Sequence, residues 1–571
     1  MHAKLISQPR FPGVILSGLL LTFVAGLLPL TADYVLFHPD ERHYVDAGIA
    51  MLENGDWLTP RTAEGELRLK KPILPYWCTL AGFSSVGVSP LGARLGFLTA
   101  GVGIVALAWW GAGLAFGSRR AACFAAVVAM TQPALVISAP RSVPDVLLAL
   151  GVMLSLCGFL AIERSGRATW TGLLAALGGG AVAILSKGLP GAAFLGFAIL
   201  FTAWRRPALL SGDWKRWSGA LVLFVAVSGS WFTVMAGLHA DELVEQFTHD
   251  QVGRNRFARH AWQAVTQLPM CIGLLCAMAA PWLLAVTPEF RSRQWRERFR
   301  RHPGVALMAS WAIVYCVLAA MINHVTPRYL LPVAAPLSIL VGGLLADVDA
   351  DRLRQRLWRV LPAGGALTAA TALIIGLQLA PRPGWLLVAV ALGLLMNLAI
   401  SSRVQRWPAV AQGIVIAASL QISLLGTGVG LSWHRDGGIG ALVDRRLDEL
   451  NHSALIKRIV FDGEIAHASQ IRVTVGNRVA VEPAPADPPV QPGDLLVLDG
   501  EVAQRLDLSQ CQVTRVPCGY RNMRADSFLW SLCTGRLSDF LKSSRRSYVL
   551  AHPRHAPEIR TVARPPESFR Q

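Results

Sequence analysis

The chain has 571 residues, of which 53% are hydrophobic and only 16% are charged, and its mean hydropathy is +0.43. A soluble protein of this length could not bury so much apolar surface, so the composition favours a polytopic membrane protein. The net charge of +18 would ordinarily indicate nucleic-acid binding. Most Lys and Arg residues lie in short loops between apolar runs, however, so membrane topology explains them better and we expect no nucleic-acid partner.

Apolar runs of membrane-spanning length follow one another from residue 12 to residue 431. The first run lacks a convincing small-residue cleavage site, so we interpret it as an uncleaved helix rather than a signal peptide. Two boundaries between spans rest on breaks inside longer apolar stretches, at 187–190 and at 381–383. Each break combines a charged residue with proline, which favours a turn of the chain there. We predict about thirteen spans, at 12–36, 74–116 (one span with an interfacial helix), 121–138, 145–162, 171–186, 188–204, 219–238, 267–288, 304–322, 329–346, 360–380, 384–402 and 409–431.

Loop charge predicts the orientation of these spans. Basic residues concentrate in the N-terminus and in alternate loops, most densely at 291–301, whereas the intervening short loops hold about one cation each. This asymmetry predicts a cytoplasmic N-terminus. An odd number of spans then carries the tail, 432–571, to the outside, and one span more or fewer would reverse it.

The tail differs in kind from the transmembrane domain, 1–431. Segments 471–475 and 495–498 are typical of strands, and 442–450 and 537–541 have helical spacing. We therefore predict a small α/β domain outside the membrane at 432–571. No CxxC motif pairs with another, which disfavours zinc, and one disulfide stays open among three cysteines: Cys511, Cys518 and Cys533.

Three outward loops are longer or more polar than a connector requires: 38–73, 138–145 and 239–266. The predicted topology puts them on one side, where they can converge over a cleft. Asp40 and Asp145 are the acids nearest to span ends, where an unpaired carboxylate costs about 2–3 kcal/mol at worst. Each could serve as a general base, and Asp40 could instead be a solvated helix cap.

Several cations lie on the outer side, where the distribution of charge in membrane proteins disfavours them. They could bind a lipid phosphate, or their stems could simply lie along the membrane interface. These cations are Lys70, Lys71, Lys187, Arg254, Arg256 and Arg328. His249 and His260 lie among acids, but their spacing fits no tight metal site, so we predict no metal ligand set and leave a divalent cation open.

An ordered series of motifs resembles the aminoarabinose-transferase-like membrane glycosyltransferases, which are relatives of the protein mannosyltransferases. The first loop reads PDERHY at 39–44, MLENGDWLTPR at 51–61 and KPILPYW at 71–77. RSVPD at 141–145, SKG at 186–188 and PRYLLP at 327–332 follow in order. The resemblance covers about residues 12–346, whereas the later spans and the tail match only in layout.

This resemblance implies an all-α polytopic GT-C fold with a soluble C-terminal domain. It also implies transfer of a sugar from a polyprenyl-phosphate donor to a lipid, glycan or protein acceptor at the outer leaflet of a bacterial inner membrane. The C-terminal domain would then be periplasmic. By position, Asp40 and Asp145 match the catalytic acids of the family, Lys71 the lysine that meets the lipid phosphate, and Tyr329 a tyrosine of the same pocket. Lys187, Arg254 and Arg328 are further phosphate-binding candidates, and the supporting candidates are Glu41, Arg61 and His249.

The chain departs from the family at two places. Relatives often have an acid before the phosphate lysine, whereas this chain has Lys70, which puts a metal site there in doubt. The third loop reads EQFTHDQ at 245–251, a loose version of the family's E-H-N stretch, so donor or acceptor can differ.

The competing prediction is a transporter or lipid flippase, which should carry charges and broken helices inside its spans. A non-catalytic assembly factor would leave the first-loop motif unexplained.

Overall fold

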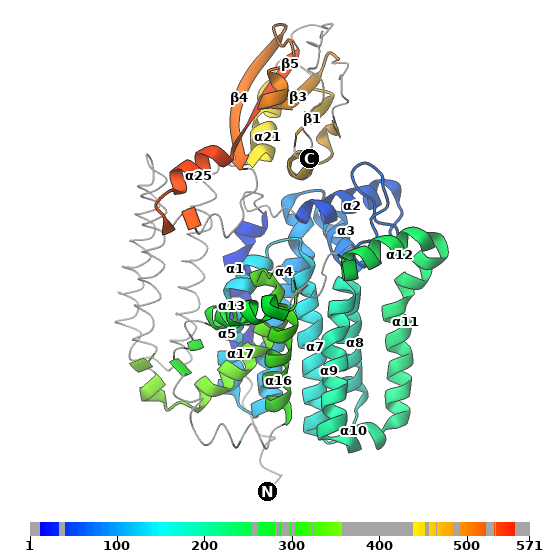
Figure 1. Cartoon of the computed structure of the whole chain (residues 1–571), viewed down its shortest axis with the longest axis vertical. Helices are drawn as coiled ribbons and strands as arrows, with labels where there is room; N and C mark the ends of the chain where they lie inside the picture. The colour runs from blue at the N-terminus through cyan, green and yellow to red at the C-terminus, as the bar shows by residue number, and fades with distance from the viewer. Residues whose placement is uncertain are drawn as a thin grey trace.

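The computed structural model describes residues 12–32, 40–253, 261–279, 303–322, 325–353, 438–451, 456–463, 465–483, 491–520 and 533–553, with a few single positions between them. Within these ranges the protein is a bundle of long helices with a smaller domain beyond one end (Figure 1). It is thus a mostly helical polytopic membrane protein.

Seven of the described helices are long and apolar enough to cross a membrane. They are α1 (Pro12–Ala32), α4 (Pro90–Phe116), α7 (Pro144–Ser165), α8 (Trp170–Lys187), α11 (Trp214–Leu238), α16 (Pro303–Ala320) and α17 (Leu331–Asp347), the last preceded by the 3-10 turn η3 (Pro327–Leu330). The apolar α9 (Leu189–Arg205) and α13 (Ala261–Ala279) are shorter or of borderline length, and α5 (Arg119–Met130), α6 (Pro133–Ser138) and α10 (Pro207–Ser211) are shorter connecting helices.

Most predicted spans up to residue 346 coincide with one of these helices, and α3 (Leu74–Val86) is the helix expected before α4. The prediction of one unbroken span at 121–138 is wrong, because the chain there divides into α5 and α6. Gln132 takes an extended conformation before Pro133, and its side-chain amide donates to the carbonyl of Ala334. The three spans predicted at 360–380, 384–402 and 409–431 lie outside the described residues.

Glycines let α7 and α8 pack closely as antiparallel neighbours. A Cβ at Gly158 would lie 2.1 Å from the backbone nitrogen of Ala176, and one at Gly179 would lie 2.3 Å from that of Ser155. Small residues allow such close helix approach in membranes. Because the two helices run in opposite directions, the first turn of α7 and the last turn of α8 meet at one end of the bundle.

The outward loops are partly helical and gather at that end. The first loop forms α2 (Glu41–Asn54), and the third forms α12 (Ala240–Thr248) and a π-helical turn, η2 (His249–Gly253). In Figure 1, α2, α3 and α12 lie at the end of the bundle that faces the C-terminal domain, and α10 lies at the opposite end. This arrangement is the convergence expected from the sequence.

The C-terminal domain contains a five-stranded mixed sheet in the order β2-β1-β3-β5-β4. Strands β1 (Arg458–Asp462), β2 (Ala480–Pro483) and β3 (Asp494–Asp499) are parallel, and β5 (Arg545–Pro553) pairs antiparallel with both β3 and β4 (Cys511–Tyr520). The helices of the domain are α21 (Gly438–Asn451), α22 (Ile465–Val475), α23 (Gly500–Ala503) and α25 (Leu537–Ser544). The predicted helices at 442–450 and 537–541 and the strand at 495–498 are confirmed.

The prediction of a strand at 471–475 is wrong, because this segment is the second half of α22. Ile471 and Val475 are one turn apart and both are buried in the domain core. Burial of this helical face overrides the weak strand preference of β-branched residues. Of the three cysteines considered for a disulfide, Cys511 and Cys533 are free thiols, and the side chain of Cys518 lies outside the described residues.

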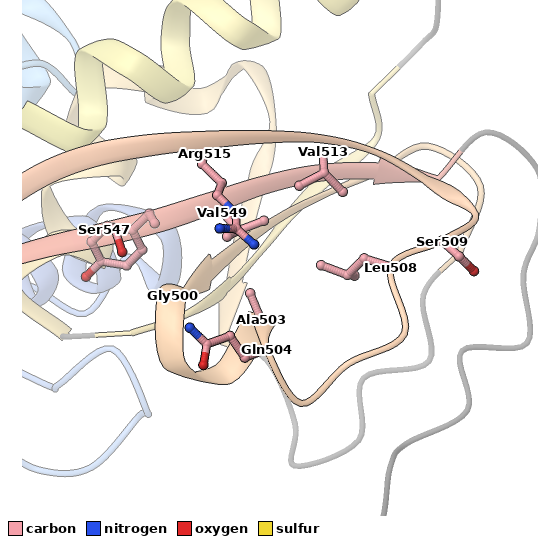
Figure 2. Close-up of a pocket in the computed structure, with 10 residues that line it drawn as sticks. Gly500, Ala503, Gln504, Leu508, Ser509, Val513, Arg515, Ser547 and Val549 are labelled. Atoms are coloured by element: carbon pink, nitrogen blue, oxygen red, sulfur yellow. The ribbon is translucent and has the colours of Figure 1, made fainter.

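A cavity of about 340 Å³ lies in this domain, between α23 and the strands β4 and β5 (Figure 2). Its lining includes Gln504, Arg515 and Ser547 beside apolar groups such as Leu508 and Val513. These residues belong to the C-terminal domain, whereas the acids and cations singled out in the sequence lie on the membrane bundle and its outward loops.

Candidate active site

Asp40 stands immediately before α2, yet its side chain does not cap the helix. The backbone of Asp40 is helical (φ −75°, ψ −19°), and its carboxylate makes no capping hydrogen bond. The carboxylate instead accepts a hydrogen bond of 2.6 Å from Nη2 of Arg328, which lies in η3. The interpretation of Asp40 as a mere helix cap is therefore wrong. Its side chain is 45% exposed, so another group can reach it.

Asp145 lies in the first turn of α7 and is buried. One carboxylate oxygen is 2.5 Å from Nζ of Lys187 in the last turn of α8, and the other is 3.7 Å from Nε of Arg328. A buried carboxylate needs such partners, because removal of its charge from water is costly. Arg328 thus lies between Asp40 and Asp145 and links two outward loops that are far apart in sequence.

Tyr329 packs against both cations. Nζ of Lys187 lies 4.3 Å from the centre of its ring, and the guanidinium carbon of Arg328 lies 5.4 Å from it. Such distances allow cation–π attraction, which is stronger at partly desolvated sites. The hydroxyl of Tyr315 also donates to the backbone carbonyl of Tyr329 at 2.8 Å. These contacts fix the turn that presents Arg328.

Lys71, at the end of the first loop, forms an ion pair with Asp250 of η2. Asp250 is buried, and Lys71 also lies close enough to Lys187 and Asp145 for their charges to act on it. Burial lowers the pKa of the Lys71 ammonium, Asp250 opposes this effect, and Lys187 adds to it. We call these three acids and three bases the ionic cluster: Asp40, Asp145, Asp250, Lys71, Lys187 and Arg328.

Two glutamines of the third loop tie the first loop to the membrane helices. The side-chain oxygen of Gln246 accepts from the backbone N–H of Leu69 at 2.9 Å, and its amide donates to the carbonyl of Leu67. Gln251 donates to Asp250 at 2.9 Å and accepts from the backbone N–H of Leu189, the first residue of α9. The third loop therefore holds Lys71 near the α8–α9 turn.

Glu41 follows Asp40 in the chain but lies in a different environment. Arg94 of α4 donates to both of its oxygens, at 2.9 and 3.1 Å, and the backbone N–H of Ser142 donates at 2.8 Å. The Glu41 and Arg94 side chains are fully buried, and Arg94 also donates to the carbonyl of Leu30. We call Glu41, Arg94 and Ser142 the buried network. It joins the first loop to α4 and to the second loop.

His43 lies in the first turn of α2 and is half-buried. Burial lowers its pKa to about 3, and the nearby Arg68 and Arg42 add to this effect. Among the described residues, no three His, Cys, Asp or Glu side chains gather as metal ligands would. Lys70, which stands where relatives often have an acid, is exposed.

The structure brings Asp40, Asp145, Lys71, Lys187, Arg328 and Tyr329 together. It does not bring Arg61 or His249 to them: the Arg61 guanidinium donates to the carbonyl of Gly65 within its own loop, and His249 is exposed. Arg254 lies outside the described residues. The sequence analysis did not include Asp250 among the site residues. The feature that could have indicated it is its position beside His249 in an outward loop rich in acids.

Comparisons with known proteins show what the chain is similar to. Residues 20–244 match the family model described as dolichyl-phosphate-mannose-protein mannosyltransferase. A relative from Pseudomonas fluorescens strain Pf0-1 is 28% identical over 369 residues, 62% of each chain, and is named undecaprenyl phosphate-alpha-4-amino-4-deoxy-L-arabinose arabinosyl transferase 2. A relative from Yersinia enterocolitica with the corresponding name is 25% identical over 64% of this chain and 65% of its own.

These alignments span somewhat less than two thirds of the relatives' length. The crystal structure of ArnT from Cupriavidus metallidurans bound to undecaprenyl phosphate is similar over almost the whole chain. It covers 94% of this chain and 97% of its own with a TM-score of 0.67, at 19% identity. At that identity the likeness shows the fold.

Proposed function

We propose a function from the premise that this chain belongs to the ArnT-like and protein-mannosyltransferase-like family of GT-C membrane glycosyltransferases. In this proposal the protein transfers a sugar from a polyprenyl-phosphate donor to an envelope acceptor. The reaction takes place at the outer face of the bacterial inner membrane. The names of the relatives make undecaprenyl phosphate the first carrier to test and 4-amino-4-deoxy-L-arabinose the first sugar. A lipid A-like lipid is the first acceptor to test.

The observation that carries this proposal is the ionic cluster, which five separate segments of the chain assemble at one end of the bundle. Asp40 accepts the proton of the acceptor hydroxyl. The acceptor oxygen then attacks the anomeric carbon, and the bond between that carbon and the phosphate oxygen breaks with its electron pair on the phosphate. One such displacement inverts the anomeric configuration.

The three cations of the cluster stabilise the departing phosphate. Negative charge grows on the phosphate as the glycosidic bond breaks, so fixed cations favour the transition state over the ground state. Each cation is held by a carboxylate: Lys71 by Asp250, Lys187 by Asp145, and Arg328 by Asp40 and Asp145. Asp145 thus acts by holding two cations in place. Glu41 supports Asp40 through the buried network.

A transporter or flippase receives less support from the same residues. In the seven described spans, charged side chains lie only near the helix ends, the deepest being Arg94, the fifth residue of α4. A transport path would instead need charged or broken segments near the membrane centre. The polar groups gathered at one end of the bundle favour chemistry at the membrane surface.

Reconstitution tests the proposal directly. The purified protein in nanodiscs is mixed with undecaprenyl-phosphate-linked aminoarabinose and lipid A, and mass spectrometry follows the acceptor. We expect a lipid product heavier by one aminoarabinose residue, together with free undecaprenyl phosphate. If the donor crosses the bilayer of a liposome intact and no acceptor gains mass, the flippase is correct instead. Envelope lipids from cells with and without the protein identify the acceptor if lipid A is not modified.

A further inference from the structure

The helix that begins at Asp40 also contacts the C-terminal domain. Asp46 of α2 is buried, and its two carboxylate oxygens accept hydrogen bonds from two residues of α22. Oγ of Ser469 donates at 2.8 Å, and Nη1 of Arg472 donates at 3.2 Å. A carboxylate on the first outward loop is therefore held by side chains more than 400 positions later in the sequence.

Apolar contacts surround this polar pair. Val45 and Ile49 of α2 share a buried cluster with Val473 of α22 and with Phe83 of α3. Val45 and Asp46 both lie beside Ile49 on α2, since residues three and four positions apart are neighbours on a helix surface. This side of α2 is thus packed against α22 of the C-terminal domain as well as against α3.

Two other contacts hold α2 from the membrane bundle. A Cβ at Gly48 would lie 2.8 Å from Cγ2 of Thr79, so α2 lies directly on α3. The buried network ties Glu41 to Arg94 of α4. The contact with α22 adds a third support on a different side, and three supports fix the tilt of a helix that two would leave free to rotate.

The contact with α22 depends on Asp46 being paired. Burial raises the pKa of Asp46 to about 6, while Arg472 and Ser469 oppose that effect. A carboxylate in such surroundings is costly without hydrogen-bond donors, so loss of the donors favours separation of the two helices. The charge and the two donors together make this contact specific.

We propose that Asp46 is a positioning residue through which the C-terminal domain sets the tilt of α2 and so places Asp40 beside Arg328. Asp40 is six residues before Asp46, about 9 Å along a helix. A small tilt at Asp46 therefore moves Asp40 relative to the acceptor, and a misplacement of about 1 Å can cost about 100-fold in rate. The proposal rests on the role of Asp40 in the proposed function.

Four variants test it in the full-length protein in nanodiscs. Asp46→Ala removes the acceptor, Asp46→Asn keeps an acceptor oxygen of the same shape, and the double change Ser469→Ala with Arg472→Met removes the donors from the other side. Glu53→Gln is the matched control, since it removes a carboxylate from the exposed end of the same helix. Hydrogen exchange of residues 41–54 and 465–475 measures the contact, and sugar transfer measures its consequence.

We expect Asp46→Ala and the double variant to lower kcat about tenfold or more, with the donor concentration for half-maximal rate unchanged and exchange in α2 faster. Asp46→Asn should recover most of the rate, and Glu53→Gln should match the wild type. A kcat within twofold of the wild type in Asp46→Ala, or unchanged exchange in α2, overturns the proposal. If the wild type transfers no sugar, the proposed function fails, and the exchange data still decide whether α22 holds α2.

Discussion

The ionic cluster and the buried network meet at two neighbouring residues, Asp40 and Glu41. Both carboxylates pair with an arginine, but the two pairs differ in exposure to solvent. Glu41 has three hydrogen-bond donors and no exposure, and its partner Arg94 is equally buried. Asp40 is 45% exposed and its partner Arg328 is 19% exposed. One peptide unit thus separates a carboxylate that is closed to solvent from one that a substrate can reach.

This difference in burial indicates that the two sets of residues have different roles, one in stability and one in catalysis. A buried charged pair with all its partners in place fixes the backbone, because any movement would expose an unpaired charge to an apolar interior. A half-exposed pair has weaker mutual attraction and can exchange partners. Changes in the buried network should therefore alter stability first, and changes in the ionic cluster should alter turnover first.

The largest expected effect comes from breaking the buried network on one side. Arg94→Met removes the guanidinium that donates to both oxygens of the buried Glu41 carboxylate, and loss of one partner of a buried ion pair costs about 3–5 kcal/mol. The free energy of unfolding, measured with denaturant in detergent, should fall by this amount. The double change Glu41→Leu with Arg94→Met should recover part of it, since no charge then remains buried. Equal stability of Arg94→Met and the wild type would contradict the assignment.

A smaller effect, on donor binding and not on stability, is expected from substitution of Lys71. Lys71→Ala should raise the donor concentration for half-maximal transfer about tenfold, because one charge-assisted contact to the phosphate is lost. Burial lowers the pKa of Lys71, so the wild-type ammonium loses its proton below the usual lysine range as the pH rises. Donor use should therefore weaken at alkaline pH in the wild type and not in Lys71→Arg, whose guanidinium keeps its charge.

An unchanged donor saturation curve in Lys71→Ala, or the same alkaline loss in Lys71→Arg, would remove Lys71 from the phosphate site. Steady-state rates between pH 7 and pH 10, with lipid and detergent held constant, provide the comparison.

The smallest effect is expected at Arg61, which lies in the same loop as Lys71 but outside the ionic cluster. Its guanidinium donates to Gly65 on an irregular turn. Arg61→Ala should change kcat and donor half-saturation by less than about twofold, as expected for a surface substitution. A loss similar to that of Lys71→Ala would mean that the whole loop, and not the ionic cluster, binds the donor.

Much of the site could be predicted from the sequence because its residues stand at the ends of apolar runs. A charge there is costly unless it has a partner, so position alone made candidates of four residues: Asp40, Asp145, Lys187 and Arg328. The family resemblance, and not position, favoured a catalytic role for Asp40 over that of a helix cap. Hydrophobic length also gave most of the described helices. The break between α5 and α6 was missed because Pro133 sits in a run whose apolar character continues on both sides.

The sequence could not show which charged side chains pair with one another, because these pairs join segments that are distant in sequence. Nothing local shows that Asp250, and not another acid of the third loop such as the exposed Glu245, pairs with Lys71. The same holds for the helix at 471–475, where β-branched residues indicate a strand and burial against the sheet imposes a helix. Local propensity is a weak guide when tertiary packing decides.

The most direct test of the account compares Asp40→Asn with the wild type for both donor binding and transfer in the same nanodiscs. Radiolabelled undecaprenyl phosphate measures binding, and the labelled acceptor measures turnover. Since a general base contributes about 100- to 10,000-fold, we expect Asp40→Asn to bind the lipid phosphate as the wild type does and to transfer sugar at least about 100-fold more slowly. Transfer at the wild-type rate would contradict the central claim that Asp40 takes the proton of the acceptor.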